Sequence, residues 1–170
     1  MGRTRQIFWL TSVFAWLLVV GLAGCSQEDP YEKYEKQQRE ADDKYIQEYL
    51  TGNNITNFTK TSTGLYYLPQ QPGTGAKIQE GNTVTMHYIG KFLNGQIFDS
   101  SYDSGIPLTF TVGENKVIKG WEQGALLMSK DEKATLIIPS HLGYGSYGSP
   151  SGSVPPGAIL MFNIDVKNVK

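Results

Sequence analysis

The sequence predicts an α+β domain over residues 63–170, in which an antiparallel β-sheet lays its apolar face on one short α-helix. Three observations predict this class. Short runs in which apolar and polar residues alternate recur between turn signals. Within this domain only residues 117–127 have a helical pattern, and strands do not alternate with helices as they do in a parallel sheet. An N-terminal helical spacer is expected to precede the domain.

The strands are expected at short apolar runs between turn signals, and in four of these runs apolar side chains recur at every second position, the period of a half-buried strand. These runs lie around residues 65–68, 84–88, 97–98, 108–112, 134–138 and 158–166. Asn94-Gly95 is a strong hairpin signal between the second and third runs. A loop is expected from Ser100 to Gly105. Gly120 and Gly124 are expected to keep the one helix short.

Residues 1–24 have the features of a signal peptide: two early arginines, an apolar run and small residues at its end. The small residues lead directly into Cys25, the only cysteine of the chain. This ending resembles the lipobox of bacterial lipoproteins, which implies cleavage before Cys25 and acylation of that residue. Multiple acyl chains give stable membrane anchoring. The alternative is a signal anchor with an incidental cysteine, which the shortness of the apolar run disfavours.

Residues 25–62 are predicted to form a lipidated tether that carries an amphipathic helix. Pro30 suits the first position of a helix, and Gly52 ends the helical pattern. Its apolar residues form one loose stripe at helical spacing: Tyr34, Ala41, Tyr45, Ile46 and Tyr49. The helix is expected to dock this stripe on the domain or on a partner, and a dimer helix is the alternative.

The composition excludes several classes of function. With 15 basic and 16 acidic residues, the chain has no positive charge excess for nucleic acid. Two histidines and one cysteine give no zinc-ligand spacing, so no metal is expected. Residues 143–148 fit the G-x-G-x-x-G pattern, but prolines follow where a dinucleotide site needs a helix.

Trp121 is the only tryptophan after the predicted signal peptide. An indole that follows a glycine either fills a core or forms the floor of a pocket, and the residue pattern alone leaves both readings open.

Six motifs follow one another along the domain. They are VTMHYIG (84–90), NGQIFDSS (94–101), VIKGWEQG (117–124), YG (144–145), VPP (154–156) and LMFNI (160–164). Together they resemble the FK506-binding protein (FKBP) family of peptidyl-prolyl cis–trans isomerases. The resemblance covers essentially all of residues 63–170 and implies a curved antiparallel sheet wrapped around one short helix, with a shallow apolar pocket for proline between them.

The resemblance also implies which residues bind and act on the substrate. The implied substrate-binding residues are Tyr88, Phe98, Asp99, Leu108, Phe110, Val117, Ile118, Trp121, Tyr144 and Phe162. Phe98, Asp99 and Tyr144 are the expected catalytic residues. Trp121 is expected to floor the pocket, while the Ile118 N–H and the Tyr144 hydroxyl donate to substrate carbonyls. Asp99 either favours the twisted carbonyl carbon electrostatically or fixes neighbouring side chains such as Tyr144.

Two positions depart from the family pattern. Leu108 stands where many members have an aromatic residue, and Ser149 lies about where some have a histidine. Both are expected at the rim of the pocket, where they bear on residue preference and macrolide affinity.

Rotation of a peptide bond needs no cofactor, because no bond is made or broken. The expected partners are proline-containing unfolded or secreted polypeptides, macrolide inhibitors, and a membrane reached through the lipid on Cys25. The expected location is the bacterial cell envelope, at the periplasmic face or the outer membrane. One alternative is a chaperone module that binds prolyl peptides with little turnover. Another is a purely structural lipoprotein whose aromatic residues form a core.

Overall fold

The computed structural model describes residues 29–170, so the predicted signal peptide and Cys25 lie outside the described residues. The elements are α1 (Pro30–Gly52), β1 (Thr59–Lys60), β2 (Tyr66–Gln71), β3 (Thr83–Lys91), β4 (Ile97–Ser100), α2 (Ser101–Ser104), β5 (Leu108–Thr111), α3 (Lys119–Leu126), β6 (Lys133–Ile138), the 3₁₀ helix η1 (Ser140–Leu142) and β7 (Leu160–Val169). Between residues 29 and 170, no helix is both long enough and apolar enough to cross a membrane.

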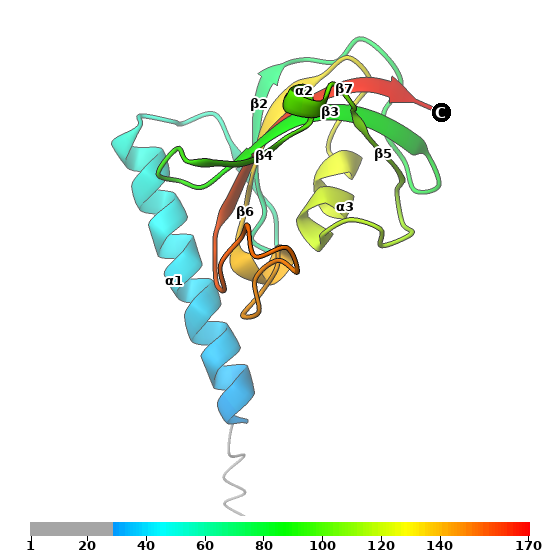
Figure 1. The fold of residues 1–170 in the computed structure, drawn as a ribbon. Coiled ribbons are helices and arrows are strands. Elements are labelled where there is room, and N and C mark those ends of the chain that lie inside the picture. Colours follow the sequence, from blue (N-terminus) through cyan, green and yellow to red (C-terminus); the bar gives the residue numbers. More distant parts are fainter. Residues whose placement is uncertain (1–28) are drawn as a thin grey trace, which may run out of the picture.

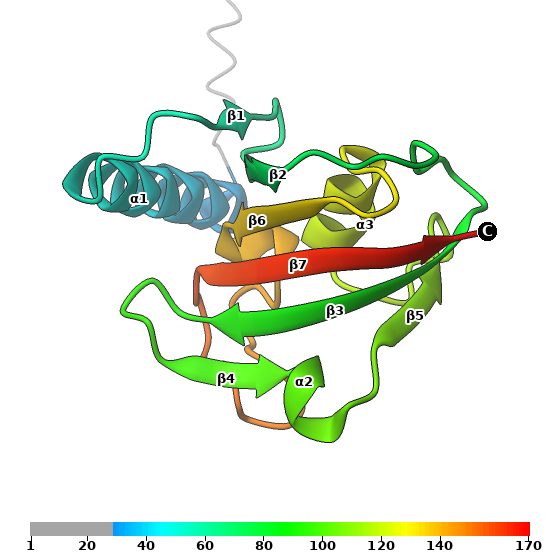
Figure 2. The same cartoon turned by 90° about the horizontal axis from the view of Figure 1, so that it is seen from above.

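The strands form one seven-stranded sheet in the order β1-β2-β6-β7-β3-β4, and β5 pairs with β3 on the same edge as β4. Every pair of neighbours is antiparallel. Figures 1 and 2 show the sheet curving over α3, with α1 beside the β2 and β6 end. The expected α+β class, with a curved antiparallel sheet around one short helix and a helix before it, is confirmed.

Apolar side chains project from both faces of the sheet, because alternate residues of a strand point in opposite directions. On β6, Leu136 and Ile138 join the main core with Trp121 of α3, whereas Ile137 joins a second cluster with Ile46 and other residues of α1. The sheet is therefore covered on one face by α3 and, at its β2–β6–β7 end, on the other face by α1.

The two glycines of α3 allow the helix to lie close against β6. A Cβ at Gly120 would lie 2.5 Å from Ile138 Cγ2, and one at Gly124 would lie 2.2 Å from Leu136 Cδ1. Real Cβ atoms essentially never come so close. These glycines therefore set the distance between helix and sheet as well as disfavouring a longer helix.

Helix α1 begins and ends where the sequence predicts. The Asp29 side chain accepts a 2.9 Å hydrogen bond from the Tyr31 N–H, and Gly52 is the last helical residue. The helix docks on the domain through a face that carries Asp42, Ile46 and Leu50, which are buried. The predicted stripe correctly included Ile46. It was wrong at Tyr34 and Tyr45, whose side chains are 52% and 61% exposed and do not dock on the domain. The four-residue spacing of the buried residues selects a face centred on Ile46.

The expected loop from Ser100 to Gly105 contains the single turn α2. The Ser100 hydroxyl accepts from the Tyr102 N–H at 3.2 Å, and Gly105 ends the turn with a left-handed φ of 68°. Serine before a helix and glycine after it are the usual capping residues. A loop was expected because one turn is too short to show a helical apolar period.

Candidate active site

A cavity of about 380 Å³ opens between α3, the β3–β4–β5 region and the loop that follows η1. Its lining residues are Tyr88, Phe98, Asp99, Leu108, Lys116, Val117, Ile118, Trp121, Tyr144 and Phe162. The structure thus brings together all the predicted substrate-binding residues except Phe110. It adds Lys116, whose position just before the Val117 motif gave no pattern signal because a lysine in a loop is normally solvated.

Trp121 forms the floor of this cavity. The residue is only 3% exposed, and its ring makes edge contacts with the rings of Tyr88 and Phe162 at centroid distances of 5.4 and 5.2 Å. The ring of Phe110 packs against Trp121 at 6.1 Å and is itself buried. Phe110 supports the floor from the core and is not among the lining residues, so its contact with a substrate stays a prediction. Trp121 therefore both fills the core and borders the pocket.

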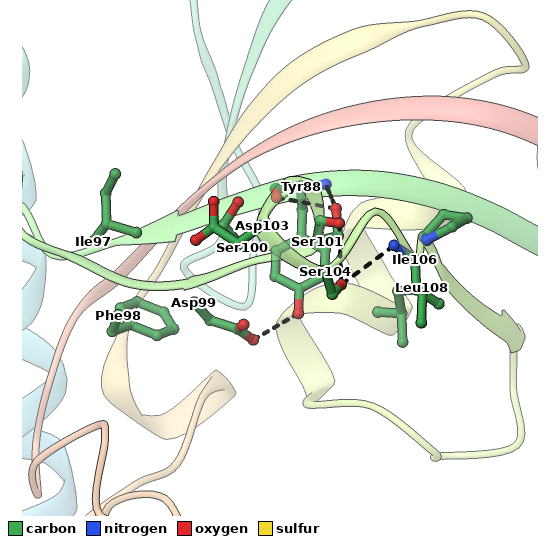
Figure 3. A pocket seen from close by; sticks show the side chains of 11 residues that line it. Tyr88, Ile97, Phe98, Asp99, Ser100, Ser101, Asp103, Ser104, Ile106 and Leu108 are labelled. Carbon is green, nitrogen blue, oxygen red and sulfur yellow. Dashed lines mark hydrogen bonds between the residues drawn. The ribbon is translucent and has the colours of Figure 1, made fainter.

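The carboxylate at the rim is held by Tyr88. The Tyr88 hydroxyl donates a 2.6 Å hydrogen bond to Asp99 Oδ2. Burial and the neighbouring carboxylate raise the pKa of the Tyr88 phenol well above its usual value. Figure 3 shows the two groups facing each other, with Phe98 beside Asp99. Asp99 therefore fixes the side chain of Tyr88, whereas the predicted example of such a neighbour was Tyr144.

Two donors at the cavity are left without a protein partner. Within residues 29–170, neither the Ile118 N–H nor the Tyr144 hydroxyl donates a hydrogen bond to a protein group. Ile118 precedes α3 in an extended conformation, so its N–H is not used by the helix. Burial and the Asp99 carboxylate raise the pKa of Tyr144, which keeps its hydroxyl protonated as a donor.

The position of Tyr88 depends on a gap in the sheet. Between its contacts with β5 and β4, β3 has no strand partner on that edge at Tyr88. The Ser101 hydroxyl fills the gap: it accepts from the Tyr88 N–H at 2.8 Å and donates to the Tyr88 carbonyl at 3.2 Å. Ser101 is only 3% exposed, so these bonds satisfy buried backbone groups that the strands leave unpaired.

A wider hollow of about 660 Å³ adjoins the cavity on the α2 side. The two share Tyr88, Phe98, Asp99 and Leu108. In Figure 3, Ile97 lies at one end of this lining, and Ile106 and Leu108 lie at the other. Leu108 is half-buried, and a smaller side chain than an aromatic ring leaves this side of the pocket open. Ser149 does not line the cavity, and its hydroxyl lies within hydrogen-bonding distance of those of Ser151 and Ser153.

The arrangement is suited to binding an apolar ring with adjacent carbonyl groups. The walls are aromatic, and two donors and one carboxylate lie at the rim. Among the residues that the structure describes, no group of three or more His, Cys, Asp or Glu side chains could hold a metal ion.

The class of protein follows from the fold, the cavity and a family match. The profile of the family described as "FKBP-type peptidyl-prolyl cis-trans isomerase" matches residues 74–167. The chain therefore belongs to the FKBP-type peptidyl-prolyl cis–trans isomerases, as the resemblance of its motifs implied.

Individual relatives agree with this assignment. The chain is 38% identical over 138 residues to the "Probable FKBP-type peptidyl-prolyl cis-trans isomerase" of Haemophilus influenzae, an alignment that covers 81% of this chain and 55% of that protein. It is 41% identical over 126 residues to the chloroplastic FKBP13 of Arabidopsis thaliana, with 68% of this chain and 61% of that protein covered. The chain spans about half the length of the curated relatives that it matches.

Among solved structures, the chain is similar to FkpA from Escherichia coli. The TM-score is 0.67 at 33% sequence identity, and the superposition covers 82% of this chain and 64% of that one. The superposed part is longer than the residues 74–167 that the family profile matches.

Proposed function

We propose that the protein is a lipid-anchored prolyl isomerase that assists the folding of secreted or envelope proteins. The observation that carries the proposal is the open aromatic cavity over Trp121, with the Ile118 N–H and the Tyr144 hydroxyl free to donate at its rim. Membership of the isomerase family supports the reaction. The signal-peptide pattern that ends at Cys25 supports the location at the cell envelope.

The first contribution to catalysis is removal of water from the X-Pro bond. Resonance makes the planar amide more dipolar than the twisted one and gives rotation a barrier of about 18–20 kcal/mol. Without a catalyst, X-Pro bonds interconvert over tens of seconds or more. Rings such as those of Trp121, Phe98 and Phe162 surround the bond with apolar groups. They therefore destabilise the planar form relative to the twisted transition state, which is differential binding.

The second contribution is orientation by the free donors. The Tyr144 hydroxyl binds the carbonyl before the proline and holds it out of the amide plane, while the Ile118 N–H anchors a neighbouring carbonyl. Asp99, fixed by Tyr88, places a negative charge near the twisted carbonyl carbon. Each tenfold in rate needs about 1.4 kcal/mol, so a few contributions of this size give a useful catalyst.

The substrates of this reaction are proline-containing segments of unfolded polypeptides. The cavity is lined on one side by Leu108 and adjoins the wider hollow near Ile106, which leaves room for a chain that continues from the proline on that side. Macrolides with a proline-like ring are expected to compete for the same cavity.

The test is a proline-peptide isomerisation assay on the full-length chain, with and without a macrolide inhibitor. The proposal expects catalysis that the macrolide abolishes. If turnover is absent while unfolded polypeptides still bind, the protein is a prolyl-peptide-binding chaperone. If neither turnover nor macrolide binding occurs, the aromatic residues are only a core and the proposal is wrong.

The anchor has a separate test. Cells that express the chain are supplied with labelled fatty acid, and the membrane fraction is examined. The wild-type protein is expected to carry the label and to sediment with membranes, whereas Cys25→Ser is expected to lack the label. An unlabelled wild-type protein would remove the lipid from the proposal and leave the isomerase activity untouched.

A further inference from the structure

Helix α1 contacts the Tyr144 loop through a buried carboxylate. Asp42 is only 2% exposed, although it lies on a helix at the surface of the protein. Its Oδ2 accepts two hydrogen bonds from Ser140, from the backbone N–H at 2.8 Å and from the hydroxyl at 2.6 Å. Its Oδ1 accepts from Gln38 Nε2 at 2.8 Å. An acidic residue is almost never buried in this way unless its oxygens are satisfied.

Ser140 is the first residue of η1, which lies beside α1 in Figure 1. The Ser140 carbonyl accepts from the N–H of Gly143 at 2.9 Å and from the N–H of Gly145 at 2.8 Å. These two residues stand directly before and after Tyr144. A single serine is therefore bonded to Asp42 on one side and to both backbone neighbours of Tyr144 on the other.

We propose that Asp42 is a positioning residue for the isomerase reaction, which holds the Tyr144 hydroxyl at the cavity by fixing Ser140. The proposal rests on the proposed function, in which that hydroxyl binds the substrate carbonyl. Asp42 lies before residues 74–167, the part that matches the family profile. Through this contact, helix α1 contributes to the geometry of the active site.

The size of the effect follows from the bonds that are lost. Asp42→Ala leaves the Ser140 N–H and hydroxyl buried without an acceptor, and such groups pull the backbone toward another partner. A displacement of the donor by about 1 Å weakens its bond to the substrate carbonyl, and the loss cannot exceed that from removing the hydroxyl itself, about two- to tenfold. We expect Asp42→Ala to lower kcat by about fivefold with little change in KM, because the carbonyl is held most strongly in the transition state.

Asparagine distinguishes positioning from charge. Asp42→Asn keeps one side-chain oxygen, which is all that the two bonds from Ser140 require, so its kcat is expected to return to near the wild-type value. Ser140→Ala removes only the hydroxyl donor and keeps the backbone N–H. It is expected to give a smaller loss than Asp42→Ala in the same direction, and it serves as the second variant if Asp42→Ala does not fold.

Asp43 provides a matched control on the same turn of α1. Its Oδ1 accepts from the Tyr66 hydroxyl at 2.7 Å and pairs with Lys60 Nζ at 2.5 Å. It therefore fastens the helix to the sheet without touching Ser140. Asp43→Ala is expected to weaken the docking of α1 and to leave kcat within about twofold of the wild type, since no loop contact is lost.

The experiment measures turnover and amide hydrogen exchange in the full-length variants. Asp42→Ala should lower kcat and speed exchange at the amides of Gly143 and Gly145, whereas Asp43→Ala should do neither. In a Tyr144→Phe background, Asp42→Ala should cause no further loss of kcat, because the group that it positions is gone.

Equal losses from Asp42→Ala and Asp43→Ala would overturn the proposal, and so would unchanged exchange at Gly145. The exchange measurement does not depend on activity. If the wild type shows no isomerisation, the proposed function fails, and the same failure overturns a role for Asp42 in that reaction even if exchange at Gly145 responds.

Discussion

Gly120→Ala tests whether the close contact between α3 and β6 sets the position of Trp121, the floor of the proline pocket. The added Cβ would lie 2.5, 2.8 and 2.9 Å from three side-chain atoms of Ile138. Ordinary van der Waals contact begins at 3.4 Å, so about 0.9 Å must be gained at the nearest atom. Ile138 is fully buried. Its χ1 rotation is restricted because its Cβ carries two carbon branches. The helix must therefore move, and Trp121 follows the substituted residue directly.

Two opposing terms give the magnitude for stability. Overpacking of a well-packed core costs about 1–3 kcal/mol, and alanine favours a helix over glycine by up to about 1 kcal/mol. The net expectation is a loss of about 1–2 kcal/mol in the free energy of unfolding, or a fall of about 4 °C in Tm. Because the pocket floor moves by nearly 1 Å, isomerase turnover is expected to fall by about tenfold or more.

The assay is urea denaturation followed by circular dichroism, with turnover measured on the same samples. Gly52→Ala is the matched control: that glycine is also helical, and its added Cβ would meet nothing within 4 Å, so stability should not fall. In an Ile138→Ala background, Gly120→Ala should lose its penalty, because the contacted atoms are gone. If Gly120→Ala were as stable and as active as the wild type, the close contact would not set the position of Trp121.

Three further predictions concern the pocket itself. Phe98→Ala should keep the fold and lose most turnover, because this half-buried ring lines the cavity beside Asp99; unfolding in circular dichroism would contradict the assignment. Tyr144→Phe should lower turnover by about two- to tenfold, the worth of one neutral hydrogen bond, and should leave Tm unchanged since that hydroxyl has no partner among residues 29–170. The pKa values of Tyr66 and Tyr88 are raised above 10.0 by burial and by hydrogen bonds to carboxylates, so their contribution to stability is complete below pH 10. Above pH 10 the unfolded chain loses protons that the folded chain keeps, so the urea midpoint should fall as pH rises, and a constant midpoint would contradict these shifts.

The strands and the short helix could be predicted because their signals are local. Alternation at Val84, Met86 and Tyr88 and the Asn94-Gly95 turn both lie within a few residues, and β3 and the β3–β4 hairpin follow. The buried face of α1 was harder to predict, because the tyrosines at 34 and 45 have the same helical period as the true contacts. Which stripe docks depends on the surface that β2, β6 and β7 present, and the helix sequence does not contain that information.

The site shows the same division between local motifs and distant contacts. The motifs predicted that Trp121, Ile118 and Tyr144 belong to one pocket, and the structure brings them to one cavity. The partner of Asp99 could not be chosen from sequence, because several hydroxyls were candidates. The bond between Asp42 and Ser140 joins residues 98 positions apart, and a polar residue in a charged helix gives no sign that it will be buried.

Because α1 covers part of one face of the sheet, it also limits how far the protein can be truncated from its N-terminus. A shortened chain that begins at residue 63 matches the boundary that the motifs suggest, yet it would uncover Tyr66, Leu68, Ile137 and Met161 to water in one patch. It would also lack β1, leaving β2 as a bare edge ready to pair with a neighbour's strand. A piece of this protein that keeps both contacts starts no later than Asp29, whose side chain caps α1, and samples trimmed to residue 63 are expected to aggregate.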